Sequence, residues 1–310
     1  MGRLTSRIAI LILGVMFYQG LLATEYKVAV RAHHGIDVAV EQWSPTLEFL
    51  SSALPKHSFK LVPVVSLKEI TERAGNNDFD FVLTNPSSFV EIAELYNARA
   101  LATLNNKRAD TAQSRFGSVI FTHVLNNDVL AIKDLKGKRL MAVSERAFGG
   151  WRVAWLELLE QGFDPYTQLK EVVFAKSKTQ PEVVMSVIDR KVDVGVVRTD
   201  LLERLDAKGK IDLRYLRIIN NKDVKDFPFF LSTRLYPEWA FAAMPNVSKN
   251  LATKIQSILF GIKPGDHAAL LGKYIGWVEA KDYASVRTLM KKLKVGPYSQ
   301  GQPSGKHRQQ

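Results

Sequence analysis

The most constraining feature of this sequence is an alternation between short apolar runs and longer amphipathic stretches in its first third. Three runs have the length and composition of buried strands: Tyr26–Arg31, Phe59–Val64 and Phe79–Thr84. Stretches with helical spacing follow them, and Ala100–Leu104 is a further strand. Strands that alternate with helices in this way predict a parallel sheet with helices on its faces. In the helix over residues 36–54, we expect Val40, Trp43, Leu47 and Leu50 to face inward.

A second unit of the same kind follows the strand-like segment Phe116–His123. In Leu140–Trp151, an apolar run breaks at a polar loop and at Gly149-Gly150 and then resumes at helical spacing, which predicts a strand that leads into a helix. Val192–Arg198 is another strand run ahead of a helix. We therefore predict a two-lobed α/β fold, with lobe one formed by residues 24–117 and 225–298 and lobe two by residues 118–224.

The two ends of the chain differ from the rest. Arg3 and Arg7 precede an apolar run and a small residue at Ala23, which is typical of a secretory signal peptide over residues 1–23. An uncleaved membrane anchor is the alternative, although the run is short for a bilayer span of about 20 residues. Residues 299–310 are polar and aperiodic, so we expect a disordered tail.

Charge and cysteine content narrow the class of protein. The formal net charge is +12, and the chain has no cysteine. Export makes nucleic acid an unsuitable partner, so the basic charge favours small anionic ligands. Without cysteine there are no disulfides, thiolate nucleophiles or lipidated N-terminal cysteines, which fits a soluble protein of the periplasm.

Candidate ligand residues follow the predicted strands, because ligands of open parallel sheets bind outside the carboxyl ends of the strands. Arg31 and His33 follow the first strand, and Thr84, Asn85, Ser87 and Ser88 follow the third. In the second unit, the backbone of Phe148, Gly149, Gly150 and Trp151 begins a helix, whose free N–H groups bind anions, and Arg198 and Thr199 end a strand. Cations, hydroxyls and helix N-termini together predict an anion site.

Each of these features has a purely structural alternative. Gly149-Gly150 is also typical of a turn in which a helix packs closely on a strand, and either arginine could pair with a nearby carboxylate. His33 and His34 have no third residue spaced to complete a metal site, and no cofactor motif is present. Ser144 lacks a Gly-x-Ser-x-Gly setting, so we expect no catalytic residue.

The sequence resembles the periplasmic phosphonate-binding branch of type II solute-binding proteins, including members associated with sensor histidine kinases. The resemblance covers about Tyr26 to Tyr298. It is carried by Phe79–Glu91, by Asp134–Lys138 through Phe148-Gly149-Gly150, and by Val192–Thr199 with Leu202-Glu203, joined by Ser232–Trp239 and Trp277–Tyr283. Glu145–Gly150 is closer to the sensor-associated relatives, whose ligands include sulfur oxyanions.

The resemblance implies a monomeric binding protein without cofactor or metal that closes on a phosphonate-, phosphate- or sulfur-oxyanion-like ligand in a cleft between two lobes. An ABC permease or, alternatively, a sensor histidine kinase is the implied membrane partner. A periplasmic enzyme acting on phosphorylated or sulfated substrates is the third alternative. The full set of expected ligand contacts is Arg31, His33, Thr84, Asn85, Ser87, Ser88, Phe148, Gly149, Gly150, Trp151, Arg198, Thr199 and Ser232.

Overall fold

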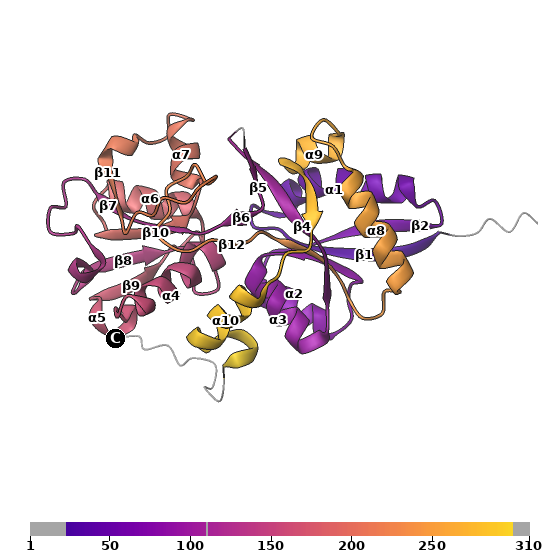
Figure 1. The fold of residues 1–310 in the computed structure, drawn as a ribbon, viewed down its shortest axis with the longest axis horizontal. Helices are drawn as coiled ribbons and strands as arrows, with labels where there is room; N and C mark the ends of the chain where they lie inside the picture. Colours follow the sequence, from indigo (N-terminus) through magenta and orange to yellow (C-terminus); the bar gives the residue numbers. More distant parts are fainter. Residues whose placement is uncertain (1–22, 110, 300–310) are drawn as a thin grey trace, which may run out of the picture.

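The computed structural model describes residues 23–109 and 111–299, which form two α/β lobes joined by extended segments (Figure 1). The signal peptide expected over residues 1–23 and the tail expected over residues 299–310 lie, except for Ala23 and Ser299, outside the described residues. Within the described ranges, no helix has both the length and the apolar character needed to cross a bilayer. The predicted two-lobed fold class is confirmed.

Lobe one is built on a sheet with the strand order β14-β4-β13-β3-β1-β2, and β5 pairs with the end of β4. Strands β1 to β4 run in one direction, and β13 is antiparallel to both of its neighbours. The strands are β1 (Thr24–Arg31), β2 (His57–Val64), β3 (Phe81–Thr84), β4 (Arg99–Arg108), β5 (Thr111–Gln113), β13 (Ala240–Ala243) and β14 (Tyr274–Glu279). The helices are α1 (Ile36–Ala53), α2 (Leu67–Gly75), α3 (Pro86–Tyr96), α8 (Lys249–Gly261), α9 (His267–Gly272) and α10 (Ala284–Leu293).

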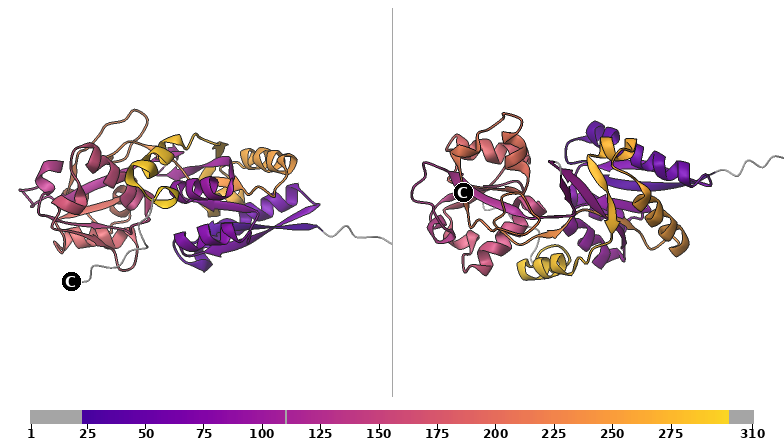
Figure 2. Two further views of the ribbon diagram at one scale, coloured as in Figure 1. Left: turned by 90° about the horizontal axis from the view of Figure 1, so that it is seen from below. Right: turned by 45° about the horizontal axis from the view of Figure 1, so that its top comes forward.

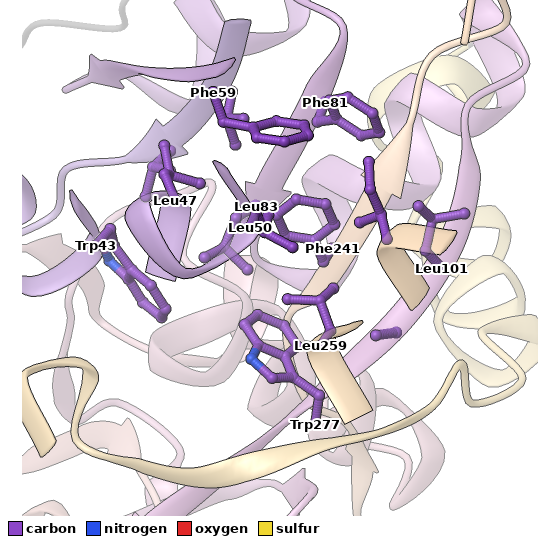
Figure 3. Close-up of a cluster of buried hydrophobic side chains, with 14 of the residues drawn as sticks. Trp43, Leu47, Leu50, Phe59, Phe81, Leu83, Leu101, Phe241, Leu259 and Trp277 are labelled. Carbon is purple, nitrogen blue, oxygen red and sulfur yellow. The ribbon is translucent and has the colours of Figure 1, made fainter. Parts of the chain in front are cut away.

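Both faces of this sheet are covered, because neighbouring strand residues point to opposite faces. Phe81 and Leu83 pack under α1 and α8, while Val82 between them packs under α2, α3 and α10. Figure 3 shows the first of these cores, in which Trp43, Leu47 and Leu50 of α1 meet Phe59, Phe241, Leu259 and Trp277. Val40 was expected in this core, but it is exposed, because the buried face of α1 runs through Ala39, four residues before Trp43.

Lobe two is built on a five-stranded sheet with the order β11-β7-β10-β8-β9. Only β7 runs against the others. The strands are β7 (Ser118–His123), β8 (Arg139–Ala142), β9 (Glu171–Phe174), β10 (Val194–Arg198) and β11 (Leu216–Ile219). The helices are α4 (Val153–Glu160), α5 (Pro165–Gln168), α6 (Gln180–Ile188) and α7 (Leu201–Asp206). Lobe two also has three short helical turns, η1 (Ile132–Leu135), η2 (Phe148–Arg152) and η3 (Leu213–Tyr215). A fourth turn, η4 (Gly296–Tyr298), follows α10 in lobe one.

The lobes are joined by two crossing strands, β6 (Arg115–Phe116) and β12 (Tyr236–Pro237), which pair antiparallel with each other. The first strand of the second sheet, β7, begins at Ser118, with one residue between it and β6. The segment that leads from β11 to β12 remains in contact with lobe two up to Ser232, whose N–H donates to the Ser118 carbonyl at 2.9 Å. We therefore propose that lobe one resumes at β12, later than the boundary at residue 225 drawn from the sequence.

A third connection lies beside the crossing strands. Helix α10 of lobe one packs against α4 of lobe two (Figure 2). Leu156 of α4 shares an apolar core with Val286 and Leu289 of α10. At the rim, Lys292 donates to Glu160 at 2.7 Å. The lobes therefore touch on the side of α4 and α10.

Truncation of one buried side chain tests the core of lobe one. Leu259 of α8 has no exposed surface, so Leu259→Ala should lower the free energy of unfolding by about 2–5 kcal/mol. Leu270 of α9 is 60% exposed, and Leu270→Ala is the matched control, for which we expect a change of less than about 0.5 kcal/mol. Urea unfolding of both variants measures this. Equal losses would contradict the placement of α8.

Candidate ligand site between the lobes

The carboxyl ends of strands from both lobes meet at the crossing strands. Arg198, the last residue of β10, pairs in the sheet with Ser118, the residue at which the chain enters lobe two. Arg31 ends β1 and Thr84 ends β3 of lobe one. Because the chain crosses between the lobes here, side chains at these strand ends can reach a ligand held between the lobes.

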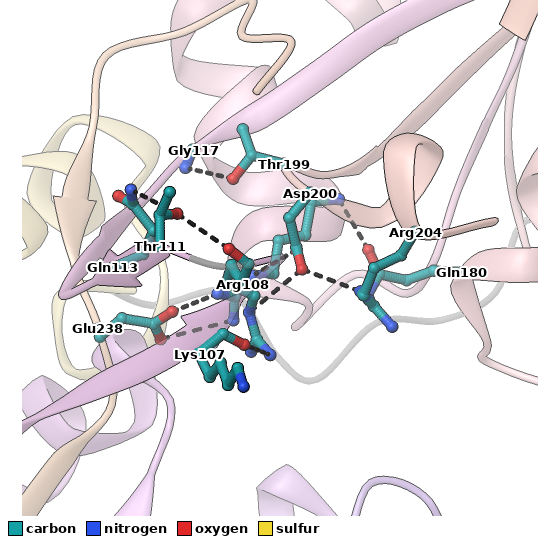
Figure 4. Close-up of polar contacts among 11 residues, drawn as sticks. Lys107, Arg108, Thr111, Gln113, Gly117, Gln180, Thr199, Asp200, Arg204 and Glu238 are labelled. Carbon is teal, nitrogen blue, oxygen red and sulfur yellow. Dashed lines mark hydrogen bonds and ion pairs between the residues drawn. The ribbon is translucent and has the colours of Figure 1, made fainter. Parts of the chain in front are cut away.

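Five charged residues gather at this junction and are named here the arginine cluster: Arg108, Arg198, Asp200, Arg204 and Glu238 (Figure 4). Nη2 of Arg198 forms a close ion pair with Oε1 of Glu238, and its Nη1 lies 3.5 Å from Oε2. Nε of Arg108 and Nε of Arg204 lie 3.1 and 2.9 Å from Oδ2 of Asp200. Counted over the described residues, three guanidinium groups share two carboxylates.

The cluster joins three parts of the molecule. Arg108 lies at the tip of the β4–β5 hairpin of lobe one, while Arg198, Asp200 and Arg204 belong to β10 and α7 of lobe two. Glu238 directly follows the crossing strand β12 and is fully buried. The Arg108–Asp200 pair is therefore a bridge between the lobes, and the Arg198–Glu238 pair ties lobe two to the crossing strand.

Arg198 is held firmly by its surroundings. Its guanidinium carbon lies 4.1 Å from the centre of the Phe116 ring in the other crossing strand, a cation–π distance. Its backbone N–H donates to Oε1 of Gln180 at 2.7 Å. Arg108 is also enclosed, and burial lowers its pKa to about 10, against the opposing charges of Asp200 and Glu238. Both arginines are charged at neutral pH.

Several atoms of the cluster are buried without a hydrogen-bond partner among the described residues. They are Nε of Arg198, Oδ1 of Asp200 and Nε of Arg108, which is ion-paired with Oδ2 of Asp200 at 3.1 Å but lacks the geometry of a hydrogen bond to it. Each such group costs about 1–3 kcal/mol. Asp200 also has a positive φ of 72°, a conformation that costs a residue with a side chain some strain. The cluster therefore contains buried polar atoms whose hydrogen bonds are not made within the described residues.

The predicted residues Arg31 and His33 lie near the cluster. The imidazole of His33 stacks on His34, with ring centres 4.0 Å apart, and meets the edge of Trp239 at 5.3 Å. Although His33 is exposed, burial of part of its ring and the charges of His34, Arg31 and Arg198 together lower its pKa to about 3. His33 is therefore neutral at physiological pH and acts as a hydrogen-bonding group. Nη1 of Arg31 donates to the Val64 carbonyl at 3.5 Å.

The polar residues after β3 organise the start of α3. Oδ1 of Asn85 accepts from the Ser88 N–H at 3.1 Å and from the Ser87 hydroxyl at 2.9 Å, which caps the helix. All four predicted residues of this segment are buried. Thr84 is fully buried, and its hydroxyl has no partner among the described residues. Thr84 therefore leaves a buried, unused hydroxyl at the strand end.

Gly149 and Gly150 allow close packing. A Cβ atom on Gly149 would lie 2.7 Å from the Phe116 ring, and one on Gly150 would lie 2.5 Å from Val143. The Gly149 carbonyl also accepts from the Ser118 hydroxyl at 2.7 Å. Phe148 and Trp151 are buried, and Phe148 packs against both crossing strands through Phe116 and Tyr236. The π-helical turn η2 is thus seated on the crossing strands, and only its first N–H groups could face a ligand.

The hydroxyls of Thr199 and Ser232 hold the crossing segments. Thr199 Oγ1 accepts from the Gly117 N–H at 3.2 Å. Ser232 Oγ accepts from the Ile120 N–H at 2.9 Å and donates to the Ile219 carbonyl at 2.7 Å. Because both hydroxyls are buried and already bonded, we leave them out of the ligand contacts that we propose below.

Four members of the cluster were not among the residues picked from the sequence: Arg108, Asp200, Arg204 and Glu238. Asp200 and Arg204 lie two and six residues after Arg198, so a search through the first turn of the following helix would have included them. No signal in the sequence places Arg108 or Glu238 here, because a hairpin and a crossing strand bring them in from distant positions.

Other concave regions lie away from the cluster. One of about 350 Å³ is lined by residues of α1 and β2, including Ser44, Glu48 and Phe59. Another of about 490 Å³, lined by Lys133, Lys136 and Phe163 among others, lies at the far end of lobe two. Over residues 23–109 and 111–299, no group of three His, Cys, Asp or Glu side chains is placed to hold a metal ion.

Comparison with known proteins gives the family. Residues 32–284 match a family described as the phosphonate, periplasmic substrate-binding protein of ABC transporters. The chain belongs to this family. Its members are binding proteins of the periplasm, so the predicted resemblance is confirmed.

One curated relative is a signalling protein. The chain is 30% identical, over 260 residues, to the tetrathionate sensor histidine kinase TtrS of Salmonella typhimurium. The match covers 84% of this chain but 43% of the kinase, so this chain spans less than half of that relative's length.

Solved structures share the fold. PhnD1 from Prochlorococcus marinus in complex with methylphosphonate has a TM-score of 0.68 at 16% identity, over 87% of this chain and 98% of that one. XAC2383 from Xanthomonas citri bound to ATP has a TM-score of 0.66 at 14% identity, over 87% and 95%. A binding protein component of an ABC phosphonate transporter from Pseudomonas aeruginosa has a TM-score of 0.65 at 14% identity, over 86% and 85%.

The Arg198–Glu238 pair predicts that the loss of one charge destabilises the protein more than the loss of both charges. Arg198→Gln leaves the buried Glu238 carboxylate without its partner and should lower the free energy of unfolding by about 3–5 kcal/mol. The double variant Arg198→Gln, Glu238→Gln removes both charges and should recover most of that loss. Urea unfolding measures both. A double variant no more stable than Arg198→Gln would show that the ion pair does not couple these residues.

The lowered pKa of His33 predicts a pH dependence of stability. Because the unfolded chain takes up this proton near the ordinary pKa of 6.5 and the folded chain only near 3, stability should fall as the pH drops through this window. His33→Gln should flatten that slope. Unfolding curves between about pH 3 and 7 test this, with His267→Gln at an exposed histidine of α9 as the control. An unchanged slope in His33→Gln would contradict the assignment.

Proposed function

We propose that this protein captures a small oxyanion between its two lobes and presents it to an ABC transporter in the membrane. The observation that carries this proposal is the arginine cluster at the meeting point of both lobes, in which guanidinium groups outnumber carboxylates and the buried Nε donors of Arg108 and Arg198 make no hydrogen bond among the described residues. Charge-assisted hydrogen bonds from such donors contribute about 1.5–3 kcal/mol each.

The contacts that we propose are drawn from both lobes. Lobe one supplies Arg31, His33, Thr84 and Arg108, with Asn85, Ser87 and Ser88 at the start of α3. Lobe two supplies Arg198, Arg204 and the first N–H groups of η2, over Phe148 to Trp151. A ligand bridging these groups would stabilise one relative position of the lobes, which is the signal that a membrane partner can recognise.

The family supports the class of ligand and the compartment. Its description names phosphonate and the periplasm, and PhnD1 was solved with methylphosphonate. We further propose that residues 1–23 direct export and that the protein works as a monomer without enzymatic activity.

A second function is supported by the similarity to TtrS, whose name describes a tetrathionate sensor kinase. In that case the ligand-bound form would act on a sensor histidine kinase, and the ligand would be a sulfur oxyanion. The set of anions tested below distinguishes the transport function from the sensing function.

Ligand binding is tested by thermal unfolding with phosphate, phosphite, methylphosphonate, sulfate, thiosulfate and tetrathionate. A ligand at 100 times its Kd should stabilise the protein by about 2.7 kcal/mol. Stabilisation by phosphonate or phosphite supports the transport function, and selective stabilisation by tetrathionate or thiosulfate supports the sensing function. If none of these anions shifts the unfolding temperature, the proposal is wrong.

The role of Arg198 is tested with the ligand found in that panel. Arg198→Ala should weaken binding more than tenfold, since the arginine supplies at least about 1.5 kcal/mol. The double variant Arg198→Gln, Glu238→Gln separates this loss from unfolding, because it keeps the charge balance. Arg139→Gln with Glu171→Gln, at an exposed pair on the far edge of lobe two, is the matched control. Wild-type affinity in both Arg198 variants would contradict the assignment.

A further inference from the structure

One oxygen of the Asp200 carboxylate is paired with two arginines, and the other makes no hydrogen bond among the described residues. Oδ2 receives Arg108 and Arg204 at 3.1 and 2.9 Å. Oδ1 is buried without a hydrogen-bond partner among the described residues, and Nε of Arg198 lies 3.7 Å from it. The side chain is 3% exposed. Oδ1 is therefore an unused acceptor within a buried ion cluster.

Two arginine donors lie at ion-pair distance from this carboxylate but make no hydrogen bond to it: Nε of Arg108, 3.1 Å from Oδ2, and Nε of Arg198, 3.7 Å from Oδ1. Nε of Arg108 and Nε of Arg198 are buried and lack hydrogen bonds of good geometry among the described residues. The group that satisfies all three atoms has to accept two hydrogen bonds and donate one, after the arginine side chains move apart to admit it. A fully ionised oxyanion can only accept. An oxyanion that retains one proton can do both.

The charge balance of the cluster also favours an oxyanion that retains one proton. The five residues of the arginine cluster carry a single net positive charge, so one negative charge neutralises the cluster. Burial and the charge of Asp200 raise the pKa of the neighbouring Glu203, which disfavours a further negative charge there. A second negative charge would lie beside Asp200 and the buried Glu238, where repulsion is poorly screened. From the end of β1, His33 is neutral at physiological pH, and Arg31 feels the opposing charge of Glu69.

We propose that the site selects a singly charged oxyanion that still carries a proton, of the hydrogen phosphonate or hydrogen phosphate type, and that Asp200 accepts this proton in a hydrogen bond. This inference rests on the proposed function and narrows its ligand class. Asp200 acts as a specificity-determining residue, while the arginines supply the attraction. An oxyanion of the same size and charge without a proton leaves Oδ1 of Asp200 unpaired.

Methylphosphonate and methanesulfonate form a matched pair of probes. As monoanions they have the same charge and nearly the same shape, but only the phosphonate carries an O–H group. At about pH 5.5, we expect titration calorimetry to give at least tenfold tighter binding of methylphosphonate, because methanesulfonate leaves a buried acceptor unsatisfied. Above its second pKa, methylphosphonate should lose about tenfold in affinity for each pH unit, whereas methanesulfonate should not change.

Two variants test whether Asp200 is responsible for the preference for methylphosphonate over methanesulfonate. Asp200→Asn should remove most of the preference for methylphosphonate over methanesulfonate. Asp189→Asn, at an exposed carboxylate paired with Lys191 at the far end of α6, should keep it. The comparison of the two probes in the wild-type protein stands on its own if Asp200→Asn fails to fold.

Two results would overturn the inference. They are equal or tighter binding of methanesulfonate, and a methylphosphonate affinity that rises with pH. Either result leaves the proposed function intact, because an oxyanion still binds. If neither these probes nor the wider anion panel binds to the wild-type protein, the proposed function fails, and this inference fails with it.

Discussion

The junction of the two lobes is built around one buried ion pair, between Arg198 and Glu238. It joins the end of a strand in lobe two to the crossing strand, and the Phe116 ring of the other crossing strand covers it. A buried pair of this kind gives little net stability, but the loss of one member is costly. Its contribution is therefore to specify where the end of β10 and the crossing strands lie, and with them every neighbouring strand end.

Much of the fold was predictable because its elements are local. The runs at Tyr26–Arg31, Phe79–Thr84 and Val192–Arg198 became strands, and η2 begins at Phe148, beside the glycine pair. The position of β13 was not predictable, because a four-residue strand from late in the chain inserts between β3 and β4. Nothing local in Ala240–Ala243 specifies those partners. Val40 was misplaced because helical spacings of three and four residues both keep to one face, and the buried residue before Trp43 is Ala39, four residues earlier, rather than Val40, three residues earlier.

The site was predictable to the level of strand ends. Arg31, His33 and Arg198 do lie near one another around the junction, as the topology of parallel sheets requires. What could not be predicted is which polar groups remain free. The hydroxyls of Thr199 and Ser232 resemble ligand contacts in the sequence, but they bond to the backbone. Arg108 and Glu238 enter from a hairpin and a crossing strand, and only tertiary structure brings them together.

The place of β13 also has a consequence for how the chain folds. Strands β3 and β4 are made early, but the strand that fills the gap between them follows the whole of lobe two. Until residue 243 is available, two strand edges in the middle of the first sheet have no partner. Lobe two, whose ends are adjacent in β6 and β12, can complete its own sheet in that interval. Folding should therefore proceed from the inserted lobe outward, and the edges of β3 and β4 are where an incomplete chain is most exposed to aggregation.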